Sequence, residues 1–245
     1  MSVVDPLLLT AARIESFAGN RPLTNASGFF FERDGRLFLV TSRHVVADEP
    51  SGHFPDRLEI EVHVDPENLA SSTRLPVPLY HAQQSLWRQG RDATGGIDVA
   101  VIAIDPNRLP ATAVYRAFTP AHLHTPPDRI EVGTPLLIVG FPLGFHDALH
   151  HMPVVRQAIV SSSFGLRFQG QGYFLTDART HRGSSGAPVV MRAEGNTAAL
   201  GDLPWSLLGV HSARLDIGGR DVALDEALGL NCAWYADILT TLTDD

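Results

Sequence analysis

The sequence predicts an all-β fold, because short apolar runs recur along it with turn residues between them. Residues 28–33 and 36–41 are apolar runs separated by Asp34-Gly35, a pair that favours the type I′ turn of a β-hairpin. Residues 58–64 alternate apolar and polar side chains with a period of two, which is typical of a half-buried strand. Several short strands joined by turns predict a barrel or a sandwich.

The N-terminal half supplies further predicted elements. Asp5 and Pro6 precede the run LLLTAA, which predicts a short capped helix, and residues 13–17 predict the first strand. His63 falls on the polar face of its strand and is expected at the surface. Residues 97–104 predict a strongly apolar strand that only Asp98 interrupts. Two polar, glycine-containing segments predict long loops, at residues 65–73 and 81–96.

The C-terminal half begins after a proline-rich segment, residues 107–128, that predicts a linker between two lobes. Apolar positions in residues 232–242 fit an amphipathic closing helix. Five runs predict the strands of the second lobe: residues 136–140, 154–163, 173–176, 187–191 and 206–213.

Composition limits the functions that are open to this chain. With 245 residues, 44% hydrophobic and 19% charged, it has the composition of an ordinary soluble protein, and no run is long enough to span a membrane. A formal net charge of −8 gives no general attraction for nucleic acid. The single cysteine, Cys232, excludes an intrachain disulfide, and the N-terminal run lacks the basic leader of a signal peptide, so we expect a cytoplasmic location.

The stretch RGSSGAP, residues 182–188, predicts a nucleophile loop. Flanking glycines allow a tight turn in which the N–H groups of Gly183 and Ser185 point toward one spot, as an oxyanion hole requires. A serine hydroxyl also needs a histidine base and a carboxylate that orients the histidine. On composition alone, the same stretch fits an ordinary Gly/Ser/Pro surface turn.

Two other motifs favour the catalytic interpretation. The run LFLVTSRHVV carries His44 at the end of an apolar strand, and IDVAVIAI carries Asp98 at the start of another. Because an unpaired charge beside a buried strand is costly, Asp98 needs a partner or a place at a wet strand edge. The order along the chain is His44, Asp98, Ser185, one of the known orders of a serine-protease triad.

These motifs resemble the chymotrypsin-like serine proteases, and within them the bacterial HtrA-type and glutamyl-endopeptidase-type enzymes. The similarity runs from about residue 28 to about residue 236 through the motifs TSRHVV, DVAVIAI, VGTPLLIVGFPLG, FLTDARTHRGSSGAP and LLGVHSA. It implies two six-stranded antiparallel β-barrels with a cleft between them, a short N-terminal helix and a C-terminal helix. The N-terminal lobe, residues 1–120, would carry His44 and Asp98, and the C-terminal lobe, residues 121–245, would carry Ser185.

The resemblance also implies an activity, the cleavage of peptide bonds in a protein or peptide substrate. His44 would take the proton of Ser185 and return it to the leaving amine, while Asp98 would hold the imidazole and Gly183 and Ser185 would stabilise the oxyanion. No cofactor and no metal is implied. His122-x-His124 and His150-His151 lack partners at a recognised metal spacing and are expected to be surface or loop histidines.

The predicted P1 pocket consists of Arg179, Thr180, His211 and Ser212. Arg179 lies six residues before Ser185, where trypsin-like enzymes that accept basic side chains have an aspartate, so a basic P1 residue is disfavoured. Thr180 and His211 match residues that help glutamyl endopeptidases to bind acidic side chains, whereas HtrA-like enzymes prefer small apolar ones. His211 also fits a core histidine.

Two other function classes remain open. A latent or inactive protease-like module would use the cleft to hold a peptide or a partner, and an esterase or acyl transferase would use the same nucleophile. No PDZ motif follows, and Ser184 replaces the aspartate that trypsin-type zymogens use in activation, so any regulation is expected to come from loops or a regulatory protein partner.

Overall fold

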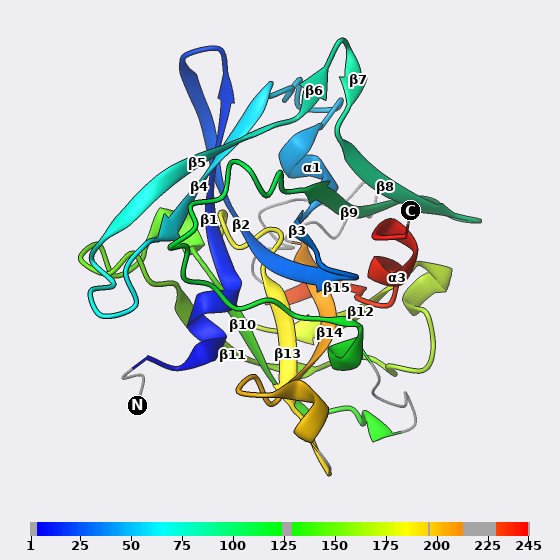
Figure 1. Ribbon diagram of the computed structural model, residues 1–245. Helices are drawn as coiled ribbons and strands as arrows, with labels where there is room; N and C mark the ends of the chain where they lie inside the picture. Colours follow the sequence, from blue (N-terminus) through cyan, green and yellow to red (C-terminus); the bar gives the residue numbers. More distant parts are fainter. Residues whose placement is uncertain (1–3, 124–128, 196, 213–228, 245) are drawn as a thin grey trace.

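The structure is a computed structural model that describes residues 4–123, 129–195, 197–212 and 229–244. The N-terminal strands lie in the upper half of Figure 1 and the C-terminal strands in the lower half. The upper part is a seven-stranded antiparallel sheet in the order β5-β4-β1-β2-β3-β9-β8. Its strands are β1 (Ala11–Ala18), β2 (Arg21–Arg33), β3 (Arg36–Thr41), β4 (Arg57–His63), β5 (Ser72–Pro78), β8 (Trp87–Asp92) and β9 (Gly95–Ala103).

The lower part is a closed six-stranded barrel in the order β10-β11-β12-β15-β14-β13. Its strands are β10 (Pro135–Gly140), β11 (Val154–Val160), β12 (Tyr173–Asp177), β13 (Pro188–Arg192), β14 (Trp205–Ser212) and β15 (Leu230–Tyr235). The predicted all-β class with two antiparallel β units is therefore confirmed. The N-terminal unit differs from the expected six-stranded barrel, because it forms a sheet of seven strands.

Short helices connect the strands. The predicted N-terminal helix is the 3₁₀ helix η1 (Pro6–Thr10), where the Asp5 side chain accepts the Leu7 N–H at 3.0 Å. The other helices in the described residues are α1 (Arg43–Val46), η2 (Pro120–Leu123), η4 (Pro142–Gly144), η5 (Phe168–Gly170), η6 (Ala198–Leu200) and α3 (Ile238–Leu242). A small hairpin of β6 (Tyr80–His81) and β7 (Gln84–Ser85) extends from the N-terminal sheet.

One hydrophobic core joins the two units. Phe29 and Phe31 of β2 are fully buried in the same cluster as Val190 of β13 and Trp234 of β15. Because these side chains come from both sheets, burial of apolar surface holds the two units against each other. The interface is therefore a fixed platform on which residues from both units can meet.

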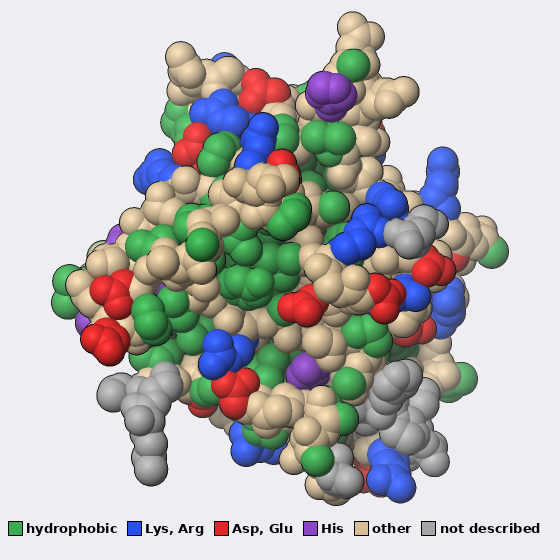
Figure 2. Space-filling model, in the orientation of Figure 1, with side chains coloured by type: hydrophobic (Ala, Val, Ile, Leu, Met, Phe, Trp, Pro, Cys, Tyr) green, Lys and Arg blue, Asp and Glu red, His purple; other side chains and the backbone are tan. Residues whose placement is uncertain are grey.

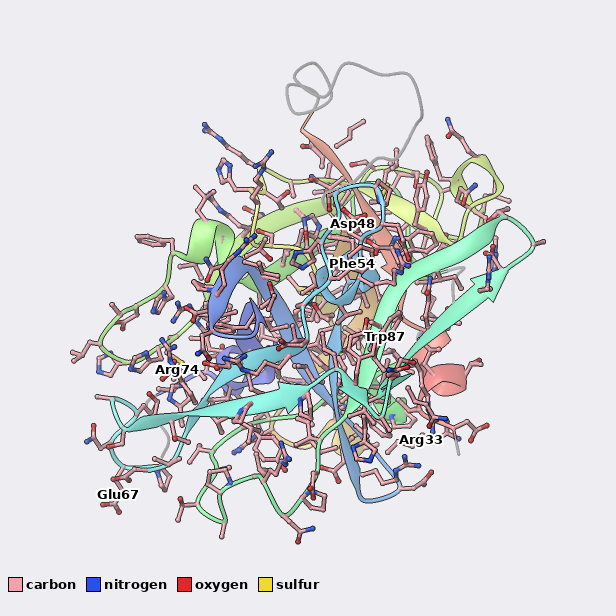
Figure 3. The ribbon with its side chains drawn as sticks, turned by 90° about the horizontal axis from the view of Figure 1, so that it is seen from above. Arg33, Asp48, Phe54, Glu67, Arg74 and Trp87 are labelled. Carbon is pink, nitrogen blue, oxygen red and sulfur yellow. The ribbon has the colours of Figure 1, made fainter. Side chains whose placement is uncertain are left out.

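The C-terminal helix α3 adds a second connection, since it packs on the N-terminal sheet. Arg33 at the end of β2 donates to the Thr240 carbonyl at 2.5 Å and to Asp244 at 2.9 Å. Arg88 of β8 reaches the Asp244 carbonyl. Figure 3 shows Arg33 and Trp87 on the α3 side of the sheet, and Arg74 and Glu67 at the other end. The chain end thus ties the second unit back to the first.

Two predictions of local structure are wrong. Residues 81–96, expected to be a long loop, contain β7, β8 and the start of β9, because tertiary pairing outweighs their polar composition. Residues 232–235, expected to begin the closing helix, belong to β15, and the helix begins at Ile238. β15 pairs with β12 on one side and with β14 on the other, and this pairing makes the segment a strand. The spacing of its apolar residues also fits a helix, so the sequence pattern alone does not decide between the two.

Two histidines are buried against expectation. His63 is 9% exposed, and its Nδ1 lies 3.1 Å from the Leu69 carbonyl, because the polar face of β4 is covered at that end. His122 is 4% exposed and packs edge-on against Phe118, with the two ring centroids 5.5 Å apart. The partner of its predicted pair, His124, lies outside the described residues.

The segment predicted to be a linker is held against the first sheet where it is described. The N–H of Phe118 donates to the Phe30 carbonyl at 3.0 Å, and the N–H of Val114 donates to the His63 carbonyl at 2.8 Å. Phe118 is fully buried. These bonds make residues 114–118 part of the N-terminal unit. The boundary between the lobes at residue 120 stays a prediction.

Candidate active site

The candidate base and carboxylate are joined by two hydrogen bonds. His44 lies in the one-turn helix α1 directly after β3, and Asp98 lies near the start of β9, which pairs with β3. His44 Nδ1 is 2.8 Å from Asp98 Oδ2, and the His44 backbone N–H donates to Asp98 Oδ1 at 2.9 Å. A carboxylate at Nδ1 favours the tautomer with its proton on that atom, which leaves Nε2 as the basic nitrogen.

Asp98 has a third polar contact from the other unit. The Ser212 hydroxyl at the end of β14 donates to Asp98 Oδ2 at 2.8 Å. The side chain of Asp98 is 19% exposed, and these bonds compensate for its partial loss of water. Ser212, predicted to line the P1 pocket, is therefore placed beside the carboxylate.

The candidate nucleophile loop depends on glycine at two positions. Gly183 has φ +92° and Gly186 has φ +86°, in the region that residues with a side chain rarely occupy. A Cβ on Gly186 would lie 2.2 Å from the Ser27 carbonyl oxygen and 2.9 Å from the Ser42 nitrogen. The loop can therefore pack against β2 and the start of α1 only because these residues lack side chains.

Every backbone carbonyl from residue 181 to residue 185 accepts a hydrogen bond. The Arg182 carbonyl accepts from the Leu143 N–H at 2.5 Å, and the Ser185 carbonyl accepts from the Ser27 N–H at 3.0 Å. The Gly183 carbonyl accepts from the Ser27 hydroxyl at 2.7 Å. The remaining two carbonyls accept from Ser184 and Ala187 within the loop. The orientation of each peptide unit is thereby fixed.

The N–H groups of Gly183 and Ser185 have no acceptor within the part of the chain that the structure describes. In a trans peptide the C=O and the following N–H point in opposite directions. Because the Arg182 carbonyl is held at Leu143, the Gly183 N–H points away from Leu143. A loop with satisfied carbonyls and two uncommitted N–H groups is suited to bind an oxyanion.

Ser27 is a residue of the candidate site that sequence reasoning missed. Besides its two bonds to the loop, its hydroxyl accepts the Phe141 N–H at 2.9 Å, and its carbonyl accepts the Thr41 hydroxyl at 2.8 Å. Ser27 is fully buried. It lies on β2 of the N-terminal sheet, 158 positions before Ser185, as the numbers 27 and 185 give. The motif ASGFF offered only a strand, so no local pattern would have identified this contact.

The two halves of the site meet at the His211 backbone. Its carbonyl accepts the Gly186 N–H at 2.8 Å and the Ser42 hydroxyl at 3.2 Å, and Ser42 is the residue before α1. Ser185 is 7% exposed, and no hydrogen bond joins its hydroxyl to His44 among the described residues. Catalytic hydrogen bonds of serine hydrolases are often long without substrate.

The other predicted P1 residues have different environments. Arg179 is exposed. Thr180 donates its hydroxyl to Asn231 Oδ1 at 2.7 Å, and Asn231 in turn donates to the Ala178 carbonyl at 2.7 Å. Asn231 was not predicted, and it lies directly before residues 232–242, the segment that was expected to be helical. His211 is completely buried, and neither ring nitrogen has a hydrogen-bond partner in the described part of the protein.

Burial determines the charge of His211. Loss of solvation, with a smaller contribution from the nearby His44, lowers the pKa of His211 to about 4. The imidazole is therefore neutral at pH 7 and offers one N–H donor. It contributes no positive charge to a substrate pocket.

Elsewhere the described residues contain no group of three or more His, Cys, Asp or Glu side chains that could hold a metal ion. His150 Nδ1 lies 2.8 Å from Asp147 on an exposed loop, as expected for a loop histidine. No helix in the described ranges is long and apolar enough to cross a membrane. On the face in Figure 2, arginine and acidic side chains are interspersed.

Solved structures with the same fold are numerous, with 342 matching chains. A variant of the HtrA-type protease AlgW with a tripeptide has a TM-score of 0.56 at 18% identity, covering 98% of this chain and 60% of that one. A serine endoprotease from Yersinia pestis has a TM-score of 0.54 at 16% identity, covering 96% and 62%. A protease from M. tuberculosis in its active form has a TM-score of 0.52 at 16% identity, covering 97% and 82%.

The chain thus spans about three fifths of the length of the first two structures. At these identities the likeness concerns the fold. No match was found among the curated proteins. The trypsin-like peptidase domain model matches residues 26–200, which include His44, Asp98 and Ser185. The chain therefore belongs to the trypsin-like peptidase family.

Proposed function

We propose that this protein is a serine endopeptidase that works through His44, Asp98 and Ser185 and an acyl-enzyme. The observation that carries the proposal is the combination of an oriented imidazole, with Asp98 on Nδ1, and a loop whose Gly183 and Ser185 N–H groups are uncommitted. These are the parts that acyl transfer from a peptide needs.

The reaction follows from these parts. His44 Nε2 removes the Ser185 proton as the hydroxyl oxygen attacks the substrate carbonyl carbon, and Asp98 stabilises the imidazolium that forms. The oxyanion accepts hydrogen bonds from the N–H groups of Gly183 and Ser185. His44 then gives its proton to the leaving amine, and water releases the acyl group by the same steps in reverse order. No cofactor takes part in this scheme.

A fluorophosphonate probe tests the proposal, because it labels activated serine hydroxyls. We expect labelling of the folded protein at Ser185, located by mass spectrometry, and no labelling of Ser185→Ala. Ser184→Ala is the matched control, since Ser184 is 2% exposed in the same loop and should leave the labelling of Ser185 in place. No labelling of a folded sample would contradict the proposal and support the alternative, a module that holds a peptide without cleaving it.

For the residue before the scissile bond we propose an acidic or a small apolar side chain. Exposed Arg179 in the place of a pocket-base aspartate disfavours basic side chains. Thr180 already donates its hydroxyl proton to Asn231, and the His211 ring is neutral at pH 7, so among the predicted pocket residues only Arg179 carries a positive charge. Peptides with Glu, Val and Lys at P1 separate these choices. Fastest turnover of Val would reject the acidic pocket, and fastest turnover of Lys would reject both.

A further inference from the structure

The side chain of Ser42 has no role in the scheme above, although Ser42 lies close to the candidate base in the chain. It is fully buried and occupies the N-cap position of α1, the helix that carries His44. Its hydroxyl donates to the His211 carbonyl at 3.2 Å, and His211 belongs to β14 of the C-terminal barrel. Ser42 therefore connects the helix of the base to the other unit.

This use of an N-cap serine differs from the usual one. The hydroxyl at an N-cap normally accepts a hydrogen bond from the second or third N–H group of its helix, but Ser42 makes no such bond. In α1 the second N–H group, that of His44, donates to Asp98 Oδ1 at 2.9 Å. The third, that of Val45, donates to the Ser42 carbonyl at 3.1 Å. Because other acceptors cap the helix, the Ser42 hydroxyl is available for a contact outside it.

The His211 carbonyl receives a second hydrogen bond, from the nucleophile loop. The N–H of Gly186, the residue directly after Ser185, donates to it at 2.8 Å. A carbonyl oxygen has two lone pairs, so it can accept from Gly186 and from Ser42 at once. One oxygen atom thus holds both the residue next to the nucleophile and the start of the helix that carries the base.

The surroundings of this carbonyl are tightly packed. A Cβ on Gly186 would lie 2.3 Å from the Thr41 hydroxyl oxygen and 2.9 Å from the Ser42 nitrogen. Thr41 and Ser42 are both fully buried. In a closely packed interior a small loss of contact shifts the neighbouring groups, so the start of α1 depends on this bond for its position against the loop.

The next residue of β14 contacts the other side of the base. The Ser212 hydroxyl donates to Asp98 Oδ2 at 2.8 Å, the same oxygen that lies 2.8 Å from His44 Nδ1. No hydrogen bond joins His44 to Ser185 in the part of the chain that the structure describes. The approach of the base to the nucleophile therefore depends on the bonds that the end of β14 makes to α1 and to Asp98.

We infer that Ser42 is a positioning residue, whose hydroxyl sets the distance between His44 and Ser185 by holding the start of α1 at the His211 carbonyl. The inference rests on the proposed endopeptidase activity. Ser42 supplies no reacting atom and acts through His44. Misplacement of a reacting group by about 1 Å costs up to roughly 100-fold in rate, so a smaller shift of the base should cost about 10-fold.

Ser42→Ala tests the inference, because it removes the hydroxyl and leaves the contacts of Asp98 and of the loop in place. The measurements are the rate at which a fluorophosphonate probe labels Ser185, and kcat and KM on a cleaved peptide. We expect the labelling rate and kcat to fall about 10-fold. KM should stay nearly unchanged, since the variant removes no group that binds the peptide.

Ser16→Ala is the matched control. Ser16 is 1% exposed, and its hydroxyl donates to the Thr24 carbonyl at 3.3 Å within the pair of strands β1 and β2. The control removes the same group and the same kind of hydrogen bond, so thermal unfolding should show a similar loss of stability in both variants. Ser16→Ala should keep the wild-type labelling rate and kcat.

A second pair of variants separates an effect on the base from an effect on the loop. Labelling of His44→Ala is compared with labelling of the double variant that also carries Ser42→Ala. High probe concentrations and long reaction times are used, because loss of a triad member leaves a slow residual reaction. Without the base there is nothing for Ser42 to position, so the two rates should agree within about 2-fold.

Three results would overturn the inference. Equal labelling rates for Ser42→Ala and Ser16→Ala would show that the Ser42 hydroxyl only stabilises the fold. A 10-fold loss that persists without His44 would show that Ser42 acts on the nucleophile loop instead of the base. In both cases labelling of the wild-type protein at Ser185 leaves the proposed function standing. A folded wild-type protein that does not react with the probe would refute the proposed function, and the role of Ser42 would fall with it.

Discussion

The two halves of the candidate site are held in different ways. His44 and Asp98 both come from the N-terminal unit and are joined through the Asp98 carboxylate, which accepts three hydrogen bonds. The Ser185 loop is held almost entirely through backbone atoms, and its side-chain hydroxyl has no hydrogen bond among the described residues. The first half should therefore be sensitive to the chemistry of its side chains. The second should be sensitive to any group that displaces its backbone.

Asp98→Asn should have the largest effect, because it changes the chemistry of the side-chain half while it keeps the size and shape of the side chain. An amide can donate to Nδ1 and so favours the wrong imidazole tautomer, which lowers kcat by roughly 10⁴-fold in a serine protease. The measurement is kcat on a cleaved peptide, together with thermal unfolding to show that the fold is retained. Asp105→Asn, on an exposed loop, is the control. Equal rates for Asp98→Asn and wild type would show that the His44–Asp98 half does not depend on the chemistry of its side chains.

Gly186→Ala should have the next largest effect, because it adds one carbon to the backbone half. The new Cβ meets the Ser27 carbonyl oxygen at 2.2 Å in a backbone with φ +86°. Strain of the backbone and overpacking each cost about 1–3 kcal/mol, so we expect a loss of about 4 kcal/mol in the free energy of unfolding, measured in urea.

Gly35→Ala separates strain from contact in that experiment. Gly35 also has positive φ, +72°, but a Cβ there has nothing within 4 Å. Its cost should be about 1 kcal/mol, from the left-handed backbone alone. If the two alanine variants lost equal stability, close approach to Ser27 would not be what holds the nucleophile loop.

The side-chain half was the easier one to predict from sequence. His44 and Asp98 lie at the ends of long apolar runs whose strands, β3 and β9, form as expected. The turn at Asp34-Gly35 was also predictable, since both residues have positive φ, 51° and 72°, as a type I′ turn requires. Local patterns determine these elements, so each of them can be predicted from its own stretch of sequence.

The position of the backbone half in the sequence could be predicted, but the contacts that orient it could not. The motif RGSSGAP indicated a loop with two free N–H groups, yet the groups that orient it come from Ser27 and Leu143, far away in the chain. Strand β15 was missed for a similar reason, because pairing with β12 and β14 decides between strand and helix for an apolar run of that spacing. The burial of His63 also depends on a distant segment, since residue 114 pairs with it.

His211 couples the backbone half to pH. Its folded pKa of about 4 lies below the ordinary histidine value of about 6.5, so the unfolded chain binds more protons than the folded one between these values. Stability is therefore complete above about pH 6.5 and is lost as the pH falls toward 4. We expect His211 to account for about 2 kcal/mol of the loss between pH 7 and pH 5. Urea unfolding at both pH values measures it.

His211→Leu is the variant that isolates this contribution. It removes the titrating group from a site where neither ring nitrogen has a partner among the described residues, so the dependence on pH should become shallower by about 2 kcal/mol. Burial also lowers the pKa of His63 and of His122, so a smaller dependence with the same sign remains. An unchanged slope in His211→Leu would show that protonation of His211 does not limit the stability of the fold.

Ser27→Ala should have the smallest effect and gives the sharpest test of the comparison, because Ser27 supports the backbone half through a side chain. Its hydroxyl holds the Gly183 carbonyl at 2.7 Å and the Phe141 N–H at 2.9 Å, and the variant leaves both groups buried without that partner. The Gly183 peptide then loses its fixed orientation. We expect kcat to fall about 10-fold with KM nearly unchanged, since an oxyanion donor acts mainly in the transition state.

Thr10→Val is the matched control for that variant. Thr10 is also fully buried, and its hydroxyl donates to the Leu7 carbonyl at 2.7 Å in η1, away from the nucleophile loop. Both variants should lose about 1–3 kcal/mol of stability, the usual cost of a buried group left without its hydrogen bond. Only Ser27→Ala should slow fluorophosphonate labelling of Ser185. If the two variants reacted at the same rate, Ser27 would stabilise the fold without orienting the loop, and the backbone half would owe its geometry to Leu143 and the glycines alone.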